Sequence, residues 1–142
     1  MLLKAYLHTD TTNENKDHDT CIHGFVVSKD GQTRIAHADN ADCSIDTDEY
    51  QFKDWSDYDT QFVVDKPGLK KSACVGYRAH VWQHTHGGAG HDTWRLKPRF
   101  VLEFSDGTEL SASPDGGDEI TLNSNGTGDK PCSLTAQPDA KG

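Results

Sequence analysis

Apolar residues along this chain occur in short runs that are separated by turn-forming residues. No long window shows apolar positions recurring at the three- and four-residue spacing of an amphipathic helix. The runs instead alternate with polar residues or are rich in Ile, Val, Phe and Tyr, which is typical of strands. The pattern predicts strands at Leu2–His8, Thr20–Ser28, Gln32–Ala38, Tyr50–Trp55, Gln61–Val64, Ala73–His84, Trp94–Phe104, Glu109–Ser113 and Glu119–Leu122.

Two of these runs indicate which side chains face a core. Within Trp94–Phe104, the alternation places Phe100, Leu102 and Phe104 on one face, so we expect a core strand there. The run Ala73–His84 alternates over most of its length. One face of it holds Val75, Tyr77, Ala79 and Val81, and the other holds Gly76, Arg78, His80, Trp82 and His84.

Turn signals separate the predicted strands. Hairpin turns are expected at Lys29-Asp30-Gly31, at Ser105-Asp106-Gly107-Thr108 and at Pro114-Asp115-Gly116-Gly117, because Gly accepts the positive φ that tight turns need. Strands spaced by about 8–12 residues predict an all-β fold, an antiparallel β-sandwich of about eight strands. We assign residues 1–122 to this domain, and residues 123–142, rich in Asn, Ser, Gly, Asp and Pro, to a flexible tail or linker.

Net charge and hydropathy indicate which classes of binding partner are not expected. The 142 residues carry a net charge of −9 and a mean hydropathy of −0.77. This charge repels phosphate backbones, so nucleic acid is not an expected partner. No segment approaches the apolar length of a transmembrane helix. Oligomeric state does not follow from the sequence.

The chain has four cysteines, Cys21, Cys43, Cys74 and Cys132. An even number allows three pairings in an exported protein, and the alternative is buried free thiols. The first residues are too soon polar for a signal peptide, so the chain is either cytoplasmic or a mature form with an added Met. We favour an extracellular or cell-surface location, which disulfides would suit.

A first candidate site lies between two predicted strands. Oxygen-bearing side chains recur at Asn13, Asn15, Asp17 and Asp19, and calcium takes six to eight oxygen ligands. The spacing resembles the start of an EF-hand loop. However, His18 occupies the place of its turn glycine, Gly24 occupies the place of its bidentate glutamate, and no flanking helices are predicted. We therefore expect a calcium loop of the sandwich type, and the alternative is a solvated polar loop.

A second acidic stretch, residues 52–59, contains Asp54 and Asp57, which are spaced to share one ion or to stabilise turns. Trp55 and Tyr58 lie among these acids. Aromatic rings beside carboxylates are common in carbohydrate sites, so both are candidate ligand-binding residues. The alternative is that the two rings belong to the core.

A third candidate is the loop from Thr85 to Asp92. His84 and His86 share one face of a strand end, and the intervening glycines allow His91 to return to them. Three histidines with Asp92 would suit zinc, copper or iron. The HxH pair is similar to that of the cupin family, but the family's later glutamate and second histidine motif are missing. In the alternative, these are ordinary polar residues at a strand end.

The segments TTNENKDHDT and THGGAGHDTW each end in Asp-Thr just before a predicted strand. A polar loop of this kind resembles the strand entries of PLAT (lipoxygenase-homology) domains and, more loosely, of C2 domains. The resemblance implies a C2/PLAT-like or jelly-roll-like sandwich with calcium at its rim, docking on membranes, proteins or other ligands. It implies calcium ligands at Asn13, Asn15, Asp17 and Asp19, with Asp54, Asp57 and Asp92 from neighbouring loops. An exposed apolar tip for membrane insertion is missing.

The hypothesis that these observations favour is a non-enzymatic, calcium-binding recognition module for a glycan, a protein or a lipid headgroup. The chain carries no GxSxG elbow and no P-loop, although catalytic triads are assembled in space and need no such motif. One alternative is a small metalloprotein or metalloenzyme that binds zinc or copper through His84, His86 and His91. Another is a structural or assembly subunit.

Overall fold

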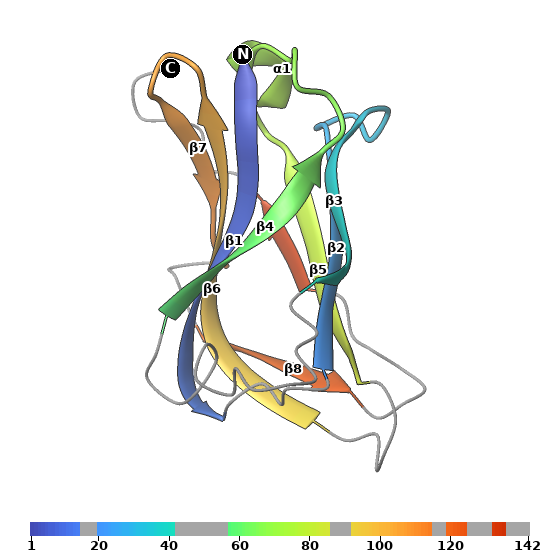
Figure 1. Cartoon of the computed structure of the whole chain (residues 1–142), viewed down its shortest axis with the longest axis vertical. Helices are drawn as coiled ribbons and strands as arrows, with labels where there is room; N and C mark the ends of the chain where they lie inside the picture. Colours follow the sequence, from blue (N-terminus) through green and yellow to red (C-terminus); the bar gives the residue numbers. More distant parts are fainter. Residues whose placement is uncertain (15–19, 42–56, 86–91, 115–118, 125–131, 136–142) are drawn as a thin grey trace.

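The computed structural model describes residues 1–14, 20–41, 57–85, 92–114, 119–124 and 132–135. These residues form nine strands and one short helix (Figure 1). The all-β class that the sequence predicts is therefore confirmed. The elements are β1 (Leu2–Glu14), β2 (Thr20–Val27), β3 (Arg34–Ala41), β4 (Asp57–Val64), α1 (Lys71–Cys74), β5 (Arg78–Thr85), β6 (Asp92–Phe104), β7 (Glu109–Ala112), β8 (Ile120–Ser124) and β9 (Cys132–Thr135).

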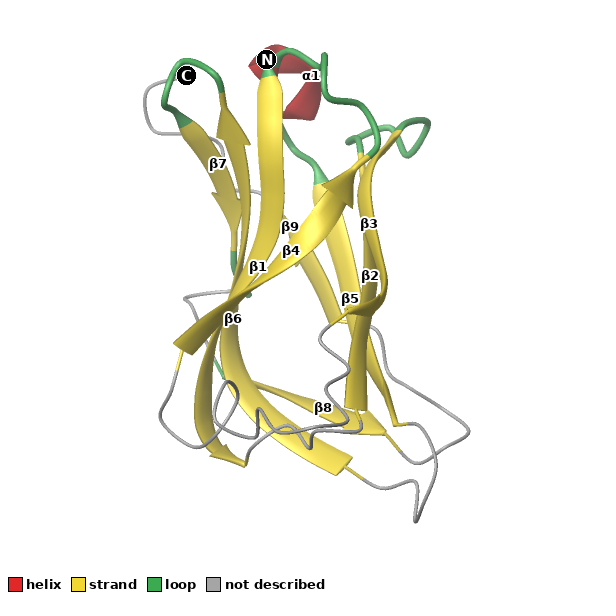
Figure 2. Cartoon of the chain, viewed as in Figure 1, coloured by secondary structure: helices red, strands yellow, loops and turns green. Residues whose placement is uncertain are grey.

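The strands form one antiparallel sheet in the order β7-β6-β1-β4-β3-β2-β5-β9, with β8 paired to β6. The sheet curls around its core, and β4 crosses from one half of it to the other (Figure 2). We call β7, β6, β1 and β4 the β1 half, and β3, β2, β5 and β9 the β2 half. β8 also contacts β5, so the curled sheet is nearly closed.

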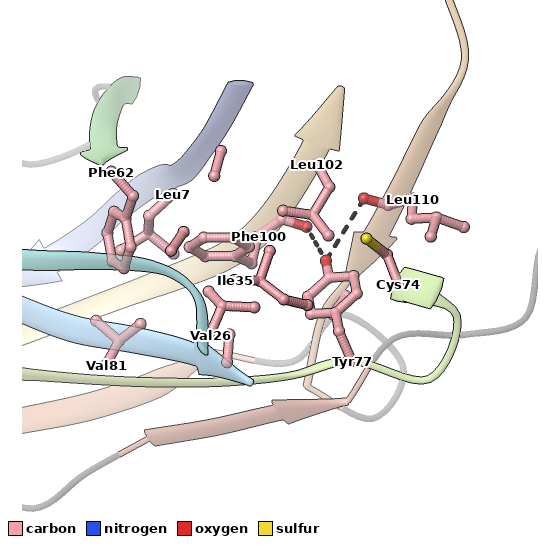
Figure 3. Packing of buried hydrophobic residues seen from close by; sticks show 14 of the residues in the cluster. Leu7, Val26, Ile35, Phe62, Cys74, Tyr77, Val81, Phe100, Leu102 and Leu110 are labelled. Atoms are coloured by element: carbon pink, nitrogen blue, oxygen red, sulfur yellow. Dashed lines mark hydrogen bonds between the residues drawn. The ribbon is translucent and has the colours of Figure 1, made fainter. Parts of the chain in front are cut away.

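Side chains on the inner faces of both halves form the core. Phe62 of β4 packs edge-to-face on Phe100 of β6, with ring centroids 4.9 Å apart. Tyr77, which precedes β5, packs against the same Phe100 ring at 6.0 Å (Figure 3). The predicted inward positions of Phe100 and Leu102 are confirmed, since both are fully buried. Tyr77 is also fully buried, whereas Val75, predicted on the same face as Tyr77, is 41% exposed.

The hydroxyl of Tyr77 fastens the two halves to each other. It donates a hydrogen bond of 2.9 Å to the carbonyl oxygen of Phe100 in β6. Burial raises the pKa of this hydroxyl far above its ordinary value, so it is protonated and can donate at neutral pH. A buried hydroxyl without a partner would cost free energy, and this bond removes that cost.

Gly24 of β2 lies beneath the Phe62 ring. A Cβ built at Gly24 would lie 2.7 Å from the carbonyl oxygen of His80 and 2.9 Å from the tip of the Phe62 ring. Both distances are shorter than real Cβ contacts, so only glycine fits here. The absence of a side chain lets a ring from the β1 half reach the backbone of the β2 half.

Among the described residues, strand pairing joins the two halves only where β3 meets β4. Ala36 and His37 pair with Val64 and Val63, and the amide of Asp65 donates to the carbonyl of Ile35 at 2.8 Å. Polar side chains reinforce this short ladder.

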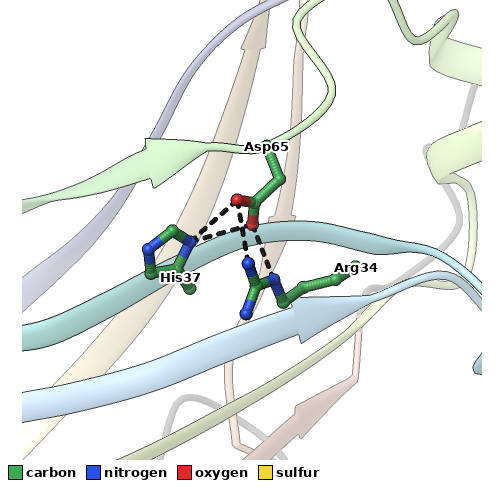
Figure 4. Close-up of polar contacts among 3 residues, drawn as sticks. All are labelled: Arg34, His37 and Asp65. Atoms are coloured by element: carbon green, nitrogen blue, oxygen red, sulfur yellow. Dashed lines mark hydrogen bonds and ion pairs between the residues drawn. The ribbon is translucent and has the colours of Figure 1, made fainter.

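The carboxylate of Asp65, just after β4, binds two residues of β3. Nε of Arg34 lies 3.0 Å from one oxygen, and Nδ1 of His37 lies 2.9 Å from the other (Figure 4). Asp65 and His37 are only partly exposed, so these contacts are shielded from solvent more than a surface ion pair is. They hold β3 against the end of β4.

Several predicted strand boundaries are wrong, three of them by four residues or more. β1 continues through Asn13, which the sequence placed in a loop, and β4 begins at Asp57 rather than at Gln61. β5 begins at Arg78 rather than at Ala73. The reason in the last case is local: residues 71–74 form the single turn of α1, and Gly76 adopts a φ of 77°.

Several other predictions can be compared with the structure. The turns at Gly31 and Gly107 are confirmed, with φ of 75° and 84°. The predicted strand Tyr50–Trp55 lies outside the described residues. Cys74 is buried with a free thiol, whereas Cys21 is disulfide-bonded. Which cysteine pairs with Cys21 stays a prediction. The segment expected as a tail contains β9, which pairs with β5.

In the described part of the chain, no helix is long and apolar enough to cross a membrane. The one helix present is a single turn.

We predict that Gly24→Ala destabilises the protein by about 1–3 kcal/mol, because the added methyl group overpacks a site walled by backbone. Chemical denaturation monitored by circular dichroism measures the change. Gly68→Ala is the matched control, since nothing lies within 4 Å of its Cβ position, and it should leave stability the same or slightly raised. Equal stability of the two variants would contradict the packing described.

Candidate functional site

The outer face of the β2 half carries rings at consecutive cross-strand positions. Register pairs Phe25 of β2 with His37 of β3 and with His80 of β5. Two residues further along, His23 of β2 pairs with Trp82 of β5. We call these five residues, His23, Phe25, His37, His80 and Trp82, the aromatic–histidine face.

These rings contact one another across the strands. His23 and Trp82 are stacked almost parallel, with centroids 5.9 Å apart and an interplanar angle of 8°. Phe25 stacks on His80 at 4.8 Å and meets Trp82 edge-on at 5.9 Å. Cross-strand aromatic pairs of this kind stabilise a sheet, and they fix the positions of the rings relative to one another.

All five side chains are partly exposed. The side chain of His23 is 16% exposed and that of His37 is 26% exposed, and Phe25, His80 and Trp82 fall in the same intermediate range. The rings on this face are therefore neither fully buried nor fully exposed to solvent. The face presents partly exposed rings, although Nε2 of His23 is itself buried.

Carboxylates border the face on the β3 side. Nδ1 of His23 lies 3.9 Å from an oxygen of Asp39, whose side chain is 81% exposed. His37 is held by Asp65 at the other end of β3. Polar partners at both ends of β3 orient imidazoles of the face without burying them.

His80 has the electrostatic environment of a neutral imidazole. Partial burial lowers its pKa below the ordinary value, and the nearby Arg78 guanidinium lowers it further. At neutral pH the ring is therefore uncharged, with one nitrogen as a donor and the other as an acceptor.

A flat apolar surface with donors and acceptors at its edges can bind a ligand that is itself both apolar and polar. Trp and Phe supply contact area at little entropic cost, and imidazole nitrogens supply hydrogen bonds. Hydrolytic or redox chemistry does not follow from this arrangement.

The structure places the flanks of all three candidate loops at one end of the sheet. β1, β3 and β5 stop at this end, and β2, β4 and β6 begin there (Figure 1). Asn13 lies near the end of β1, and Asp57 and Asp92 begin β4 and β6. The candidate residues Asn15, Asp17, Asp19, Asp54, Trp55, His86 and His91 lie outside the described residues.

Two other candidates lie on strands. Tyr58 is in β4, opposite Thr9 of β1. His84 is in β5, opposite Cys21. Within the described residues, no group of three His, Cys, Asp or Glu side chains is arranged to hold a metal ion.

The aromatic–histidine face was not predicted as a site from the sequence, although two of its five residues were visible there. The alternation in residues 73–84 placed His80 and Trp82 on one common face. The contribution of His23, Phe25 and His37 depends on the pairing of β3, β2 and β5, which a single chain does not reveal.

No protein-family model matches this chain, and no curated protein matches it in sequence.

We predict that His80 titrates below the ordinary histidine pKa of about 6.5 in an NMR pH titration. Since the folded state binds the proton more weakly than the unfolded state, the contribution of His80 to stability is present above that ordinary value. It is lost as the pH falls toward the lowered pKa. Arg78→Gln should raise the pKa of His80, and Arg99→Gln, on the outer face of the β1 half, should not. Titration of His80 at or above the ordinary value would contradict this.

Proposed function

We propose that this chain is a non-enzymatic recognition module that binds a glycan on the aromatic–histidine face. The observation that carries the proposal is the set of partly exposed rings, with Phe25 and Trp82 between imidazoles. Sugars have apolar C–H faces and polar hydroxyl edges. Phe25 and Trp82 would pack on the former, and an imidazole nitrogen of His80 would bond to the latter.

Glycan is favoured over the other ligand classes by the dimensions and charge of the face. It spans three strands and two rows of outward residues, which is small for a stable protein–protein interface. The net charge of −9 opposes binding to nucleic acid and to anionic membranes. A protein or a lipid headgroup as ligand would be an alternative outcome of the binding experiment.

We further propose that the end of the sheet near Asn13, Asp57 and Asp92 binds calcium. The support is topological: the strands that flank the acidic segments meet at this end, as the resemblance to PLAT and C2 domains implies. Carboxylate and amide oxygens are the ligands that calcium prefers. His23 and Trp82 lie closest to this end of the face, because β2 begins and β5 stops there, so an ion would lie near the bound ligand.

We predict that screening on a glycan array selects a ligand whose affinity falls about tenfold or more in Trp82→Ala, the loss expected for a central aromatic contact. Isothermal titration calorimetry measures the affinity. Tyr6→Ala is the matched control, because Tyr6 is a partly exposed aromatic residue on the outer face of the β1 half. Binding that survives Trp82→Ala unchanged would remove the aromatic–histidine face from consideration.

We predict that calcium raises the melting temperature and that EDTA reverses the rise, because a ligand that binds only the folded state stabilises it. At a calcium concentration 100 times Kd the gain is about 2.7 kcal/mol. The double variant Asp17→Ala with Asp19→Ala should lose this gain and keep its fold. A shift with zinc but none with calcium would favour the alternative site at His84, His86 and His91 instead.

A further inference from the structure

One end of the aromatic–histidine face carries two arginines. Register places Arg34 of β3 and Arg78 of β5 on either side of Val27 of β2. This row is the next outward row after His37, Phe25 and His80. Both arginines are exposed, so the face is positive at this end, whereas Asp39 borders the opposite end.

The two arginines differ in their partners. Arg34 is held by the carboxylate of Asp65 through two contacts, at 3.0 Å and 3.3 Å. Among the described residues, no acidic side chain forms an ion pair with Arg78. Its Nη2 lies 3.4 Å from the Cβ position of Gly31, over the turn between β2 and β3. The guanidinium of Arg78 is thus placed against backbone and open to an anion.

A hollow lies beside the same turn. It measures about 660 Å³ and lies between the turn and α1. Lys29 borders it, and the stem of Lys29 packs on Gly76, two residues before Arg78. Hydroxyl-bearing residues complete much of the remaining wall: Ser28, Thr33 and Ser72.

One carboxylate, that of Asp30, also borders the hollow. It is occupied within the turn, because one of its oxygens accepts hydrogen bonds from the Ser28 hydroxyl at 2.6 Å and from the Gln32 amide at 3.0 Å. These bonds lower the pKa of Asp30, so its charge offsets one of the two cations. Lys29 and Arg78 still leave a local excess of positive charge.

This local excess of positive charge contrasts with the negative net charge of the whole chain. A chain with a net charge of −9 repels anions at long range, so an anion binds only where local donors outweigh that field. A guanidinium offers two parallel N–H donors that match a carboxylate or a sulfate group. His80, next to Arg78 on the same face of β5, adds an imidazole nitrogen.

We propose that Arg78 and Lys29 bind an anionic group, a carboxylate or a sulfate, and that the ligand of the aromatic–histidine face is an acidic glycan. The second part rests on the proposed glycan-binding function. The rings would hold the sugar, and Arg78 would select sugars that carry a negative charge. Arg34, already bound to Asp65, contributes little.

The first test uses inorganic sulfate as the probe, so that it is independent of any glycan. Titration with sulfate, followed by NMR at the arginine Nε–H signals, should shift Arg78 in a saturable manner, and high concentrations of sodium chloride should weaken the effect. Arg99 of β6 is the internal control, since it is an exposed arginine on the β1 half. Equal, non-saturating shifts at Arg78 and Arg99 would overturn the anion site.

The second test compares a sulfated oligosaccharide with its desulfated counterpart by calorimetry. The sulfated form should bind more tightly, and Arg78→Gln should reduce that affinity about tenfold or more. Arg99→Gln removes the same charge from the other half and should have little effect. Lys29→Gln should cause a smaller loss than Arg78→Gln, because Lys provides a single point charge.

The outcomes separate the two proposals. Equal binding of both oligosaccharides to the wild type and to Arg78→Gln would overturn the selection for acidic glycans and leave glycan binding intact. A saturable sulfate shift at Arg78 with no binding of either oligosaccharide would support the anion site for a free anion and contradict the glycan function. Loss of folding in Arg78→Gln is checked by circular dichroism, and Arg78→Lys then provides a second, milder variant.

Discussion

The contact between the Phe62 ring and the bare backbone of Gly24 determines how the sheet closes. Phe62 comes from the β1 half and Gly24 from the β2 half, and a single methyl group at Gly24 would separate them. Phe62 in turn supports Phe100, against which Tyr77 packs and to which its hydroxyl is bonded. Only 33% of the residues are apolar, and a few aromatic contacts hold the two halves together around the core.

The same contact shapes the outer face. Side chains alternate along a strand, so His23 and Phe25, on either side of Gly24, point away from the core. The ladder between β2 and β3 shifts register between Ile22 and Gly24, where β3 carries one extra residue. The positions of the outward rings on the aromatic–histidine face therefore depend on the inward contact between Gly24 and Phe62.

Local patterns predicted most of the fold but little of the site. The alternation around Phe100 identified inward residues correctly, whereas Val75, placed on the same face as Tyr77, is exposed. Glycine identified the turns at Gly31 and Gly107. The extension of β1 past His8 was not predictable from periodicity, because its polar residues gain strand structure from pairing with β6 and, at Thr9 and Asp10, also with β4. The aromatic–histidine face was not predicted for a related reason. Its rings come from three strands, and strand order is a long-range property that composition does not encode.

The central claim is that a ligand binds on the outer face of the β2 half. Chemical-shift mapping with a glycan selected on an array tests it most directly. We predict that the largest shifts fall on the ring and indole signals of Phe25, His80 and Trp82. Shifts centred instead on Tyr6, His8 and Arg99, on the outer face of the β1 half, would contradict the claim.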